Sequence, residues 1–309
     1  MPRILEPGQI EAFAERSIAR IRLPERTAPF AARAARLRAL SAPGAIGHAI
    51  GDYLRLMAAV ADAQQAALRT FEACLPTPAQ IGQAREHRMP PIHATGWPRP
   101  LEWRELAVHI AAAAVAAAEV PAGVRQVHQL LCALPPQQME AQADALLATR
   151  VDGVEGGTAP FLMAALQVCW VAVASRLQPA DVSQLEVPGL CPACGTLPVA
   201  SIVRADERSQ GHRYLHCALC ATEWHLVRVT CSHCQSTANI TYHTIAGGTE
   251  AIRAESCDQC HTYRKILYQE KDVGVEPVAD DLGSLALDLL MAEAGYHRGS
   301  GNPLLWQGS

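Results

Sequence analysis

The segment RYLHCALCATEWHLVRVTCSHC, residues Arg213–Cys234, contains two of the four Cys-x-x-Cys pairs in this chain. The pairs are Cys191/Cys194, Cys217/Cys220, Cys231/Cys234 and Cys257/Cys260. A gap of 22 residues follows both Cys194 and Cys234, and each cysteine of the first two pairs recurs 40 residues later. This spacing is an internal repeat, and it divides the region into two similar modules.

Paired cysteines at this spacing are typical of metal sites. Two thiolates separated by two residues can bind one metal ion from a tight turn, and two such turns joined by a hairpin complete a tetrahedron. A module of about 40 residues is too small to be stabilised by hydrophobic burial alone, so metal binding would add folding energy on the order of 10 kcal/mol. We predict two tetrathiolate sites, the first made by Cys191, Cys194, Cys217 and Cys220 and the second by Cys231, Cys234, Cys257 and Cys260. A cross-braced arrangement, in which alternate pairs share a site, is the alternative.

The four thiolates of each site suit zinc and equally suit a single rubredoxin-type iron. Gly195 follows Cys194 in a Cys-Pro-Ala-Cys-Gly context that favours a tight metal-binding turn, whereas Ala221, Gln235 and His261 follow the other pairs. We therefore expect the other three turns to be less regular, and one site to be more labile.

Other candidate residues have simpler explanations. Four sulfurs per module leave no vacancy for the histidines beside the cysteines, for which we expect surface or supporting roles; these are His216, His225, His233 and His261. The isolated Cys74, Cys132 and Cys169 are expected to be small core residues. Asp280, Asp281 and Asp288 are expected to cap a helix and line a solvated face, with an acidic contact face as the alternative. Because no Ser-His-Asp order, phosphate loop or paired carboxylates can be identified, we predict that the protein is not an enzyme.

Charge is distributed unevenly along the 309 residues, with a net value of −4. Residues 1–190 hold 17 basic and 17 acidic side chains, residues 191–275 hold 8 of each, and residues 276–309 hold 1 and 5. The cysteine region therefore lacks the basic surface that nucleic-acid binding requires, which argues against a nucleic-acid partner.

The apolar stretches of the chain are too short for membrane insertion. Phe161–Ala174 is shorter than the roughly 20 residues that a span needs, and it contains Gln167, so we expect a buried helix. No secretory signal is expected, because charged residues interrupt the beginning of the chain: Arg3, Glu6, Glu11 and Glu15. We predict a cytoplasmic protein, in which thiols stay reduced and paired cysteines indicate metal binding rather than disulfides.

Hydrophobic periodicity and prolines predict helices up to about residue 187. We expect helices ending near Leu40, over 46–71, over 102–119, from Pro136 to about Arg150 and over 160–177, with a loop over 89–100. Beyond Pro188, short β-branched segments predict strands over 224–229 and 266–268, followed by a helix over 279–293. The apolar tail at 302–306 must dock on this chain or form a contact site.

These elements predict a multidomain α+β protein. An all-α N-terminal helical domain (1–187) is followed by two small rubredoxin-like or zinc-ribbon β modules (188–230 and 231–272), and a C-terminal helix and tail (273–309) complete the chain.

The amino-acid sequence around the cysteines resembles that of one protein family. The segments Leu190–Ser201 (LCPACGTLPVAS), Arg213–Cys234, Glu255–Asp272 (ESCDQCHTYRKILYQEKD) and Asp280–Met291 are similar to the formate dehydrogenase accessory protein family, FdhE. The closing residues 301–305 also resemble the tail of that family. The resemblance is close over the last 120 residues or so, and the helical region fits in length and character.

The resemblance implies a function that the spacing alone does not indicate. The family assists the maturation of respiratory formate dehydrogenases, and its members act as chaperones that contact the catalytic subunit in the cytoplasm before export. The metal implied is rubredoxin-type iron, one ion in each site, bound by the eight cysteines named above, with zinc as the alternative. A rubredoxin-like redox protein is the alternative function, and a zinc-ribbon nucleic-acid-binding module is a third. The sequence predicts neither the oligomeric state nor the contact surface for the partner.

Overall fold

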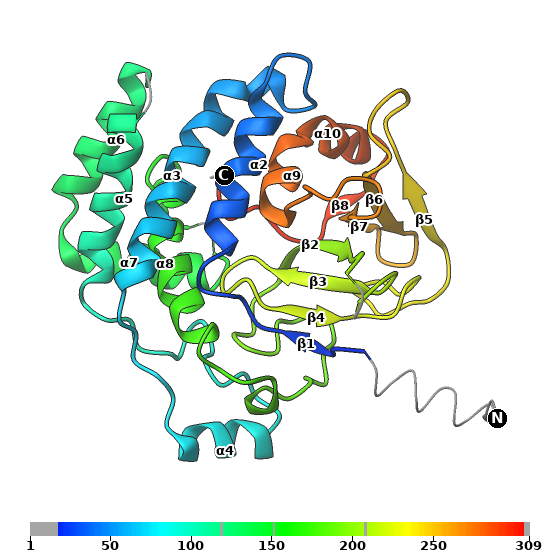
Figure 1. The fold of residues 1–309 in the computed structure, drawn as a ribbon, viewed down its shortest axis with the longest axis horizontal. Coiled ribbons are helices and arrows are strands. Elements are labelled where there is room, and N and C mark those ends of the chain that lie inside the picture. Colours follow the sequence, from blue (N-terminus) through cyan, green and yellow to red (C-terminus); the bar gives the residue numbers. More distant parts are fainter. Residues whose placement is uncertain (1–17, 118–119, 151, 207–208, 306–309) are drawn as a thin grey trace.

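The computed structural model describes residues 18–117, 120–150, 152–206 and 209–305. The N-terminal charged residues that argue against a secretory signal, and Trp306 at the end of the tail, lie outside these ranges. Helices gather on one side of the molecule and a β-sheet on the other, with α9 (Pro277–Gly283) packed between α2 (Pro29–Ser41) and β2 (Pro198–Val203) (Figure 1). This is the predicted α+β class, with a helical N-terminal part and cysteine-bearing strands toward the C-terminus.

The remaining described helices of the N-terminal part are α3 (Gly51–Thr70), α4 (Pro78–Glu86), α5 (Trp103–Ala117), α6 (Ala122–Ala133), α7 (Pro136–Leu147) and α8 (Ala159–Ala174), with 3₁₀ turns at His48–Ile50 and Pro179–Asp181. Helices α7 and α8 begin at or beside the prolines that predict them, whereas α4 and α6 were not predicted. Proline occupies the first turn of α2, α4, α7, α8 and α9, where its missing N–H leaves no hydrogen bond unmade. Helix α3 begins about five residues later than the periodicity over 46–71 predicts, because the 3₁₀ turn precedes it.

Helix α8 is the centre of the helical core. All of its residues except Met163 are buried, and it contacts α3, α5 and α7. This confirms the prediction of a buried helix for the apolar segment 161–174. No helix in the described part of the chain combines the length and hydropathy needed to cross a bilayer.

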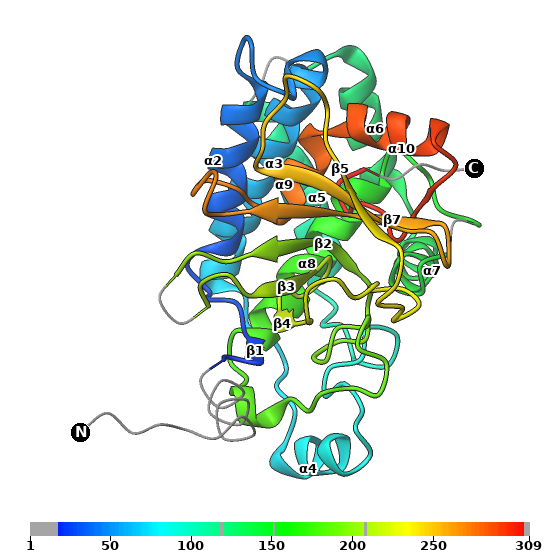
Figure 2. The ribbon, with the colours of Figure 1, turned by 90° about the vertical axis from the view of Figure 1, so that its right-hand side faces the viewer.

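One sheet contains the eight strands of the described residues. The strands are β1 (Ile21–Arg22), β2, β3 (Arg213–Cys217), β4 (Glu223–His225), β5 (Ile240–His243), β6 (Ile252–Cys257), β7 (Thr262–Tyr268) and β8 (His297–Arg298). Their order is β1-β4-β3-β2-β7-β6-β5, and β8 pairs with the beginning of β7. In Figure 2, β4, β3, β2 and β7 follow one another up the sheet. Val227 and Val229 lie outside β4, and Val229 has a φ of 59°, so the predicted strand over 224–229 is shorter than expected.

The 40-residue repeat is visible in the topology. Each module consists of a cysteine turn, two strands, a second cysteine turn and a third strand, which gives β4-β3-β2 in the first module and β7-β6-β5 in the second. Parallel pairing between β2 and β7, with Ser201 opposite Ile266, joins the two modules edge to edge. The domain boundaries after residues 187, 230 and 272 stay predictions.

The predicted C-terminal helix over 279–293 is two helices, α9 and α10 (Leu285–Glu293), separated at Ser284. The buried ammonium group of Lys265 donates hydrogen bonds to the carbonyl oxygens of Asp281 (2.7 Å) and Ser284 (3.1 Å). The Ser284 hydroxyl donates to the carbonyl oxygen of Asp280 at 2.6 Å. These carbonyl groups therefore find partners outside the helical ladder, and the helix can break without leaving them unpaired.

The expectation of a solvated acidic face at Asp280, Asp281 and Asp288 is wrong. Asp280 and Asp281 are fully buried, and each carboxylate has a cationic partner: Arg36 for Asp280 (2.6 Å), and Arg298 and Lys265 for Asp281. Asp288 binds Lys265 at 2.6 Å. Three acidic residues that appear solvated from helical periodicity alone instead connect α9 and α10 to α2, β7 and β8, because a buried carboxylate requires a paired cation.

The tail docks on its own chain as far as the structure describes it. Leu304 is fully buried, and the Tyr53 hydroxyl donates a hydrogen bond to its carbonyl oxygen. The Asn302 side-chain amide donates to the carbonyl oxygen of Val278 (2.9 Å) and to the Asp281 carboxylate (2.7 Å). These contacts attach the C-terminal segment to both α3 and α9.

Candidate metal centres

The first cysteine group, comprising Cys191, Cys194, Cys217 and Cys220, lies at the junction of the sheet and the helical core. Its four Sγ atoms all lie within 4.8 Å of one another. Sγ of Cys191 lies 3.6 Å from that of Cys220, and Sγ of Cys194 lies 3.4 Å from that of Cys217. A tetrahedral ion with metal–sulfur bonds of about 2.3 Å separates its sulfurs by about 3.8 Å, whereas a disulfide would bring them to about 2.05 Å. The spacing therefore fits a metal ion with little movement.

The second cysteine group, comprising Cys231, Cys234, Cys257 and Cys260, repeats this geometry. The Sγ atoms of Cys231 and Cys260 are 3.7 Å apart, as are those of Cys234 and Cys257. The four sulfurs again lie within 4.8 Å of one another. Both groups follow the sequence order, so each module contains a complete set of four candidate ligands. Among the described residues, no histidine or carboxylate joins either group.

All cysteines in the described residues are free thiols, and the three isolated ones differ in burial. Cys169 is buried in α8, as expected for a small core residue. Cys74 and Cys132 are exposed, so the prediction that they belong to the core is wrong for these two. Cys132 lies on the outer face of α6, most of whose residues are exposed.

The four cysteine turns, which we call knuckles (residues 191–196, 217–222, 231–236 and 257–262), share one backbone conformation. The residue after the second cysteine has a positive φ in each: 78° at Gly195, 58° at Ala221, 64° at Gln235 and 53° at His261. The expectation that the turns without glycine are less regular is therefore wrong. Three non-glycine residues adopt the left-handed region at a cost of roughly 1–2 kcal/mol each, and metal binding can offset this cost.

Backbone hydrogen bonds close each knuckle and direct N–H groups at the sulfurs. The N–H of Cys191 donates to the carbonyl oxygen of Thr196 at 2.9 Å, and the same bond recurs from Cys217 and Cys231 to the residues five positions on. In the fourth knuckle, Cys257 pairs with Thr262 in the β6–β7 ladder. The N–H groups of residues 219 and 220 each lie 3.3 Å from Sγ of Cys217. Such donors stabilise thiolates.

A hydroxyl residue closes every knuckle, and our sequence reasoning missed it. Thr196, Thr222, Ser236 and Thr262 each stand two residues after the second cysteine of a pair. Three of the hydroxyl oxygens lie within 3.1 Å of a cysteine sulfur. The pattern Cys-x-x-Cys-x-Ser/Thr, present four times, was the signal that could have identified them.

Three cysteines of the first group have strongly shifted pKa values. Burial is the largest influence on the pKa of Cys191 and of Cys220, and it contributes to raising both well above the ordinary value of a thiol. At Cys217 burial also acts to raise the pKa, but hydrogen bonds from the neighbouring thiols and from Thr196 outweigh it and hold the pKa well below its usual range. Four thiolates cannot share so small a volume without a cation, and a divalent ion would supply that charge.

Burial distinguishes the two groups. Each cysteine of the first group is at most 1% exposed. In the second group Cys231 and Cys257 are buried, Cys260 is partly exposed and Cys234 is exposed. Metal and solvent, or a partner protein, can reach the second group directly, whereas the first is enclosed by protein.

The helical region encloses the first group. The predicted loop over 89–100 lies against the first knuckle, where the N–H groups of Ile92 and Ala94 donate to the carbonyl oxygens of Ala193 (3.1 Å) and Cys194 (2.8 Å). Helix α8 supports the second knuckle, where the Gln167 amide donates to the carbonyl oxygen of Ala218 at 2.7 Å.

Buried polar contacts extend this support. Gln167 accepts a hydrogen bond from Arg33 (3.3 Å), and Arg33 pairs with Glu276 (3.2 Å) at the N-terminus of α9. The first group is therefore connected to α8, α2 and α9 through one polar network.

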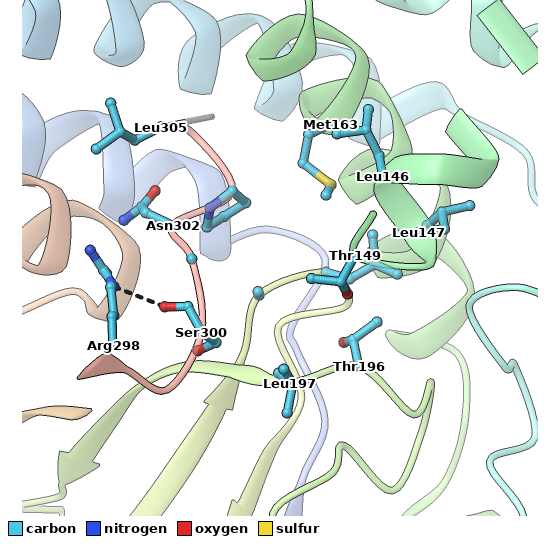
Figure 3. A pocket seen from close by; sticks show the side chains of 14 residues that line it. Leu146, Leu147, Thr149, Met163, Thr196, Leu197, Arg298, Ser300, Asn302 and Leu305 are labelled. Carbon is cyan, nitrogen blue, oxygen red and sulfur yellow. Dashed lines mark hydrogen bonds between the residues drawn. The ribbon is translucent and has the colours of Figure 1, made fainter. Parts of the chain in front are cut away.

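A cavity of about 350 Å³ adjoins the first group (Figure 3). Its walls come from the end of α7 and from α8 on one side, the C-terminal segment on the other, and the first two knuckles. Leu146 and Met163 face the segment that includes Arg298 and Leu305, while Thr196 lies at the base. The walls are predominantly apolar, and residues of the first two knuckles form part of them.

Two of the flanking histidines, His216 and His225, contact side chains outside the cysteine groups. His216 Nδ1 lies 3.1 Å from the Glu223 carboxylate. Although burial acts to raise it, the pKa of Glu223 is held at about 2 by Arg204 and His216. Burial, together with His212 and nearby arginines, lowers the pKa of His225.

Comparison with known proteins covers nearly the whole chain. Three family models match in sequence: "FdhE, N-terminal" over residues 18–186, "FdhE, central domain" over 190–228 and "FdhE, C-terminal domain" over 229–305. A protein FdhE homolog of Cronobacter sakazakii is 40% identical over 310 residues, covering 99% of this chain and 98% of the relative. Protein FdhE of Escherichia coli K12 is 41% identical over 277 residues, covering 89% and 87%.

A solved structure agrees with these similarities. The crystal structure of the FdhE protein from Pseudomonas aeruginosa superposes with a TM-score of 0.79 at 38% identity, covering 94% of this chain and all of that one. Sequence and fold thus match from the first described helix to the docked tail, including both cysteine groups. The chain belongs to the FdhE family.

Proposed function

We propose that this protein is an accessory factor for the maturation of respiratory formate dehydrogenase, and that it binds the immature catalytic subunit in the cytoplasm. The observation that supports this most is similarity to FdhE proteins over 99% of the chain at 40% identity. Similarity of that extent includes the helical region, both modules and the tail, so the role that the family name indicates is proposed for the whole molecule.

Each cysteine group would hold one metal ion, with the eight cysteines as ligands. The sulfur spacings of 3.4–3.7 Å support this assignment. We favour iron in both sites, as the family resemblance implies. Zinc is the alternative, because tetrathiolate sites accept either metal. Iron would supply one-electron chemistry, whereas zinc would be structural.

Non-enzymatic assistance is the favoured activity. The cavity beside the first group presents mostly apolar walls, and the thiols of the described site are grouped in fours at a spacing that suits metal binding. The exposure of Cys234 supports one alternative, a rubredoxin-like protein that passes electrons during maturation. The equal numbers of acidic and basic residues over 191–275 argue against nucleic acid as a partner.

Deletion of the gene tests the maturation role. We expect formate dehydrogenase subunits to be made at normal levels while formate oxidation is lost, and expression of this chain from a plasmid to restore it. Affinity capture of the chain from the cytoplasmic fraction should recover the catalytic subunit. Full formate oxidation in the deletion strain would contradict the proposal.

Anaerobic purification followed by metal analysis separates the two candidate metals and so decides whether redox chemistry is available to the protein. Iron with visible ferric-thiolate absorption that is bleached reversibly by a reductant would favour the redox alternative or a redox-dependent accessory factor. A colourless protein containing two zinc ions would leave only the structural role for the metals.

A further inference from the structure

The hydroxyl groups that close the four knuckles differ in what they contact, although their sequence positions are equivalent. In the first group, Thr196 Oγ1 lies 3.1 Å from Sγ of Cys194 and 3.1 Å from Sγ of Cys217. Thr222 Oγ1 lies 3.1 Å from Sγ of Cys220, with the thiol as the donor. The first group therefore has three contacts between a hydroxyl and a sulfur, two of them made by Thr196.

The second group has fewer such contacts. Thr262 Oγ1 lies 2.9 Å from Sγ of Cys260. Ser236, the counterpart of Thr196 forty residues later, directs its hydroxyl to the backbone instead: it donates to the carbonyl oxygen of Ala238 (3.3 Å) and accepts from the Ala238 N–H (3.2 Å). No contact between the Ser236 hydroxyl and a sulfur is present in the described structure.

A hydroxyl that donates to a metal-bound thiolate withdraws electron density from the sulfur. The sulfur becomes a weaker electron donor to the metal, so sulfur-to-metal charge transfer needs more energy and the reduction potential of an iron site rises. The effect is larger where water is excluded, because a low local dielectric strengthens the hydrogen bond. The two sulfurs that Thr196 contacts meet this condition, since both are at most 1% exposed.

We propose that the Thr196 hydroxyl tunes the first metal site through two of its ligands. Because the corresponding hydroxyl in the second group, that of Ser236, contacts no sulfur, the two bound metals differ electronically. The inference rests on the proposed metal binding. Thr196 acts as a positioning residue whose one hydroxyl proton serves Cys194 and Cys217, and the first site has the higher charge-transfer energy and, with iron, the higher reduction potential.

Cobalt(II) is the probe that tests this, because its charge-transfer bands report directly on sulfur donor strength. The full-length apoprotein is loaded anaerobically with two equivalents of Co²⁺, and the near-ultraviolet bands are compared between variants. Thr196→Val removes the hydroxyl at nearly constant volume and leaves the backbone bond from Cys191 to residue 196 in place. We expect the bands of one cobalt ion to shift to lower energy.

Matched variants define the cause of the shift. Thr196→Ser retains the hydroxyl and should restore the wild-type bands, whereas Ser236→Ala removes a hydroxyl that touches no sulfur and should leave the spectrum unchanged. Thr222→Val removes a hydroxyl that accepts from the Cys220 thiol instead of donating to it, so this variant should leave the bands nearly unchanged. Thr196→Ala, which removes the same hydroxyl as Thr196→Val with a smaller side chain, decides the question if Thr196→Val does not hold two cobalt ions.

The outcomes distinguish the inference from the function on which it rests. Unchanged bands in Thr196→Val with two cobalt ions bound, or an equal shift in Thr222→Val or Ser236→Ala, would overturn the tuning role and leave the metal sites intact. Failure of the wild-type protein to bind two cobalt ions would overturn the metal sites themselves, and the tuning role with them.

Discussion

The two cysteine groups have the same ligands, the same 40-residue module and the same knuckle conformation, yet their surroundings differ. The first is enclosed by the 89–100 loop, α8 and the C-terminal segment, whereas the second leaves Cys234 exposed at the surface. Local sequence therefore sets the geometry of a site, and packing against the rest of the chain sets its stability and access. We infer that the first site is part of the core and that the second is available to solvent or a partner.

The largest difference is expected from equivalent ligand substitutions. Cys194→Ser removes a ligand from the buried site and should destabilise the whole protein by several kcal/mol. A structural metal ion contributes on the order of 10 kcal/mol in small domains. Cys234→Ser, its counterpart in the second module, should lose one metal ion while the helical region melts at the wild-type temperature. Metal analysis and thermal unfolding followed by circular dichroism measure both, and equal melting temperatures for the two variants would break the comparison.

A second contrast concerns arginines that are also 40 residues apart. Arg213 is fully buried and binds Glu255 of the second module at 2.7 Å, while Arg253 stacks on Tyr268 with 4.8 Å between the guanidinium and the ring centroid. Arg213→Met leaves Glu255 buried without its cation and should cost about 3–5 kcal/mol. Arg253→Met should cost about 1 kcal/mol or less. Urea unfolding measures both, and a cost for Arg213→Met no larger than that for Arg253→Met would show that the ion pair between modules is dispensable.

The buried carboxylate Glu223 adds a pH-dependent contrast, since its counterpart in the second module is Tyr263. Its folded pKa of about 2 lies below its unfolded value of 4.5, so the stabilisation is present above pH 4.5 and is lost as the pH falls toward 2. Glu223→Gln should lose about 3 kcal/mol at pH 7, and the difference from wild type should shrink below pH 4.5. Urea unfolding at several pH values tests this, and a difference that stays constant from pH 7 to pH 3 would contradict the assignment.

The smallest effects are expected in the knuckles themselves. Gly195→Ala places a side chain in the left-handed region, 3.0 Å from His93, and should cost about 1–2 kcal/mol. Gln235→Gly removes the side chain from the same left-handed conformation in the third knuckle, which lies in the more exposed second group. It should change the free energy of unfolding by less than about 1 kcal/mol. Thermal unfolding of the metal-loaded protein compares them; a cost in Gln235→Gly as large as in Gly195→Ala would mean that the two knuckles are not conformationally equivalent.

Cysteine spacing and hydrophobic periodicity predict most of the architecture. The apolar segment 161–174 becomes a buried helix because its composition allows no other environment, and the 40-residue repeat becomes two strand modules because their ligands must converge. Residue type at the knuckles was a poor guide: Ala221 and His261 adopt the glycine conformation because the closed turn requires it.

Long-range contacts could not be predicted from local patterns. Asp280 and Asp281 resemble exposed helix-start residues until Arg36 and Arg298, 244 and 17 residues away, are brought beside them. The burial of the first group likewise depends on a loop about 100 residues earlier in the chain, for which the sequence contains no signal beyond its prolines. The hydroxyl at the end of each knuckle was visible in the sequence, but its contact with sulfur required the fold.

Metal release to a chelator tests the central claim most directly. The native protein is purified anaerobically, its metal content is measured, and transfer of the metals to an excess of chelator is followed over time. We predict two ions per chain that leave in two phases, the second slower by on the order of 100-fold or more because the buried site must unfold to open. The fast phase should be missing in Cys234→Ser. A single phase for both ions, or fewer than two ions per chain, would contradict the account.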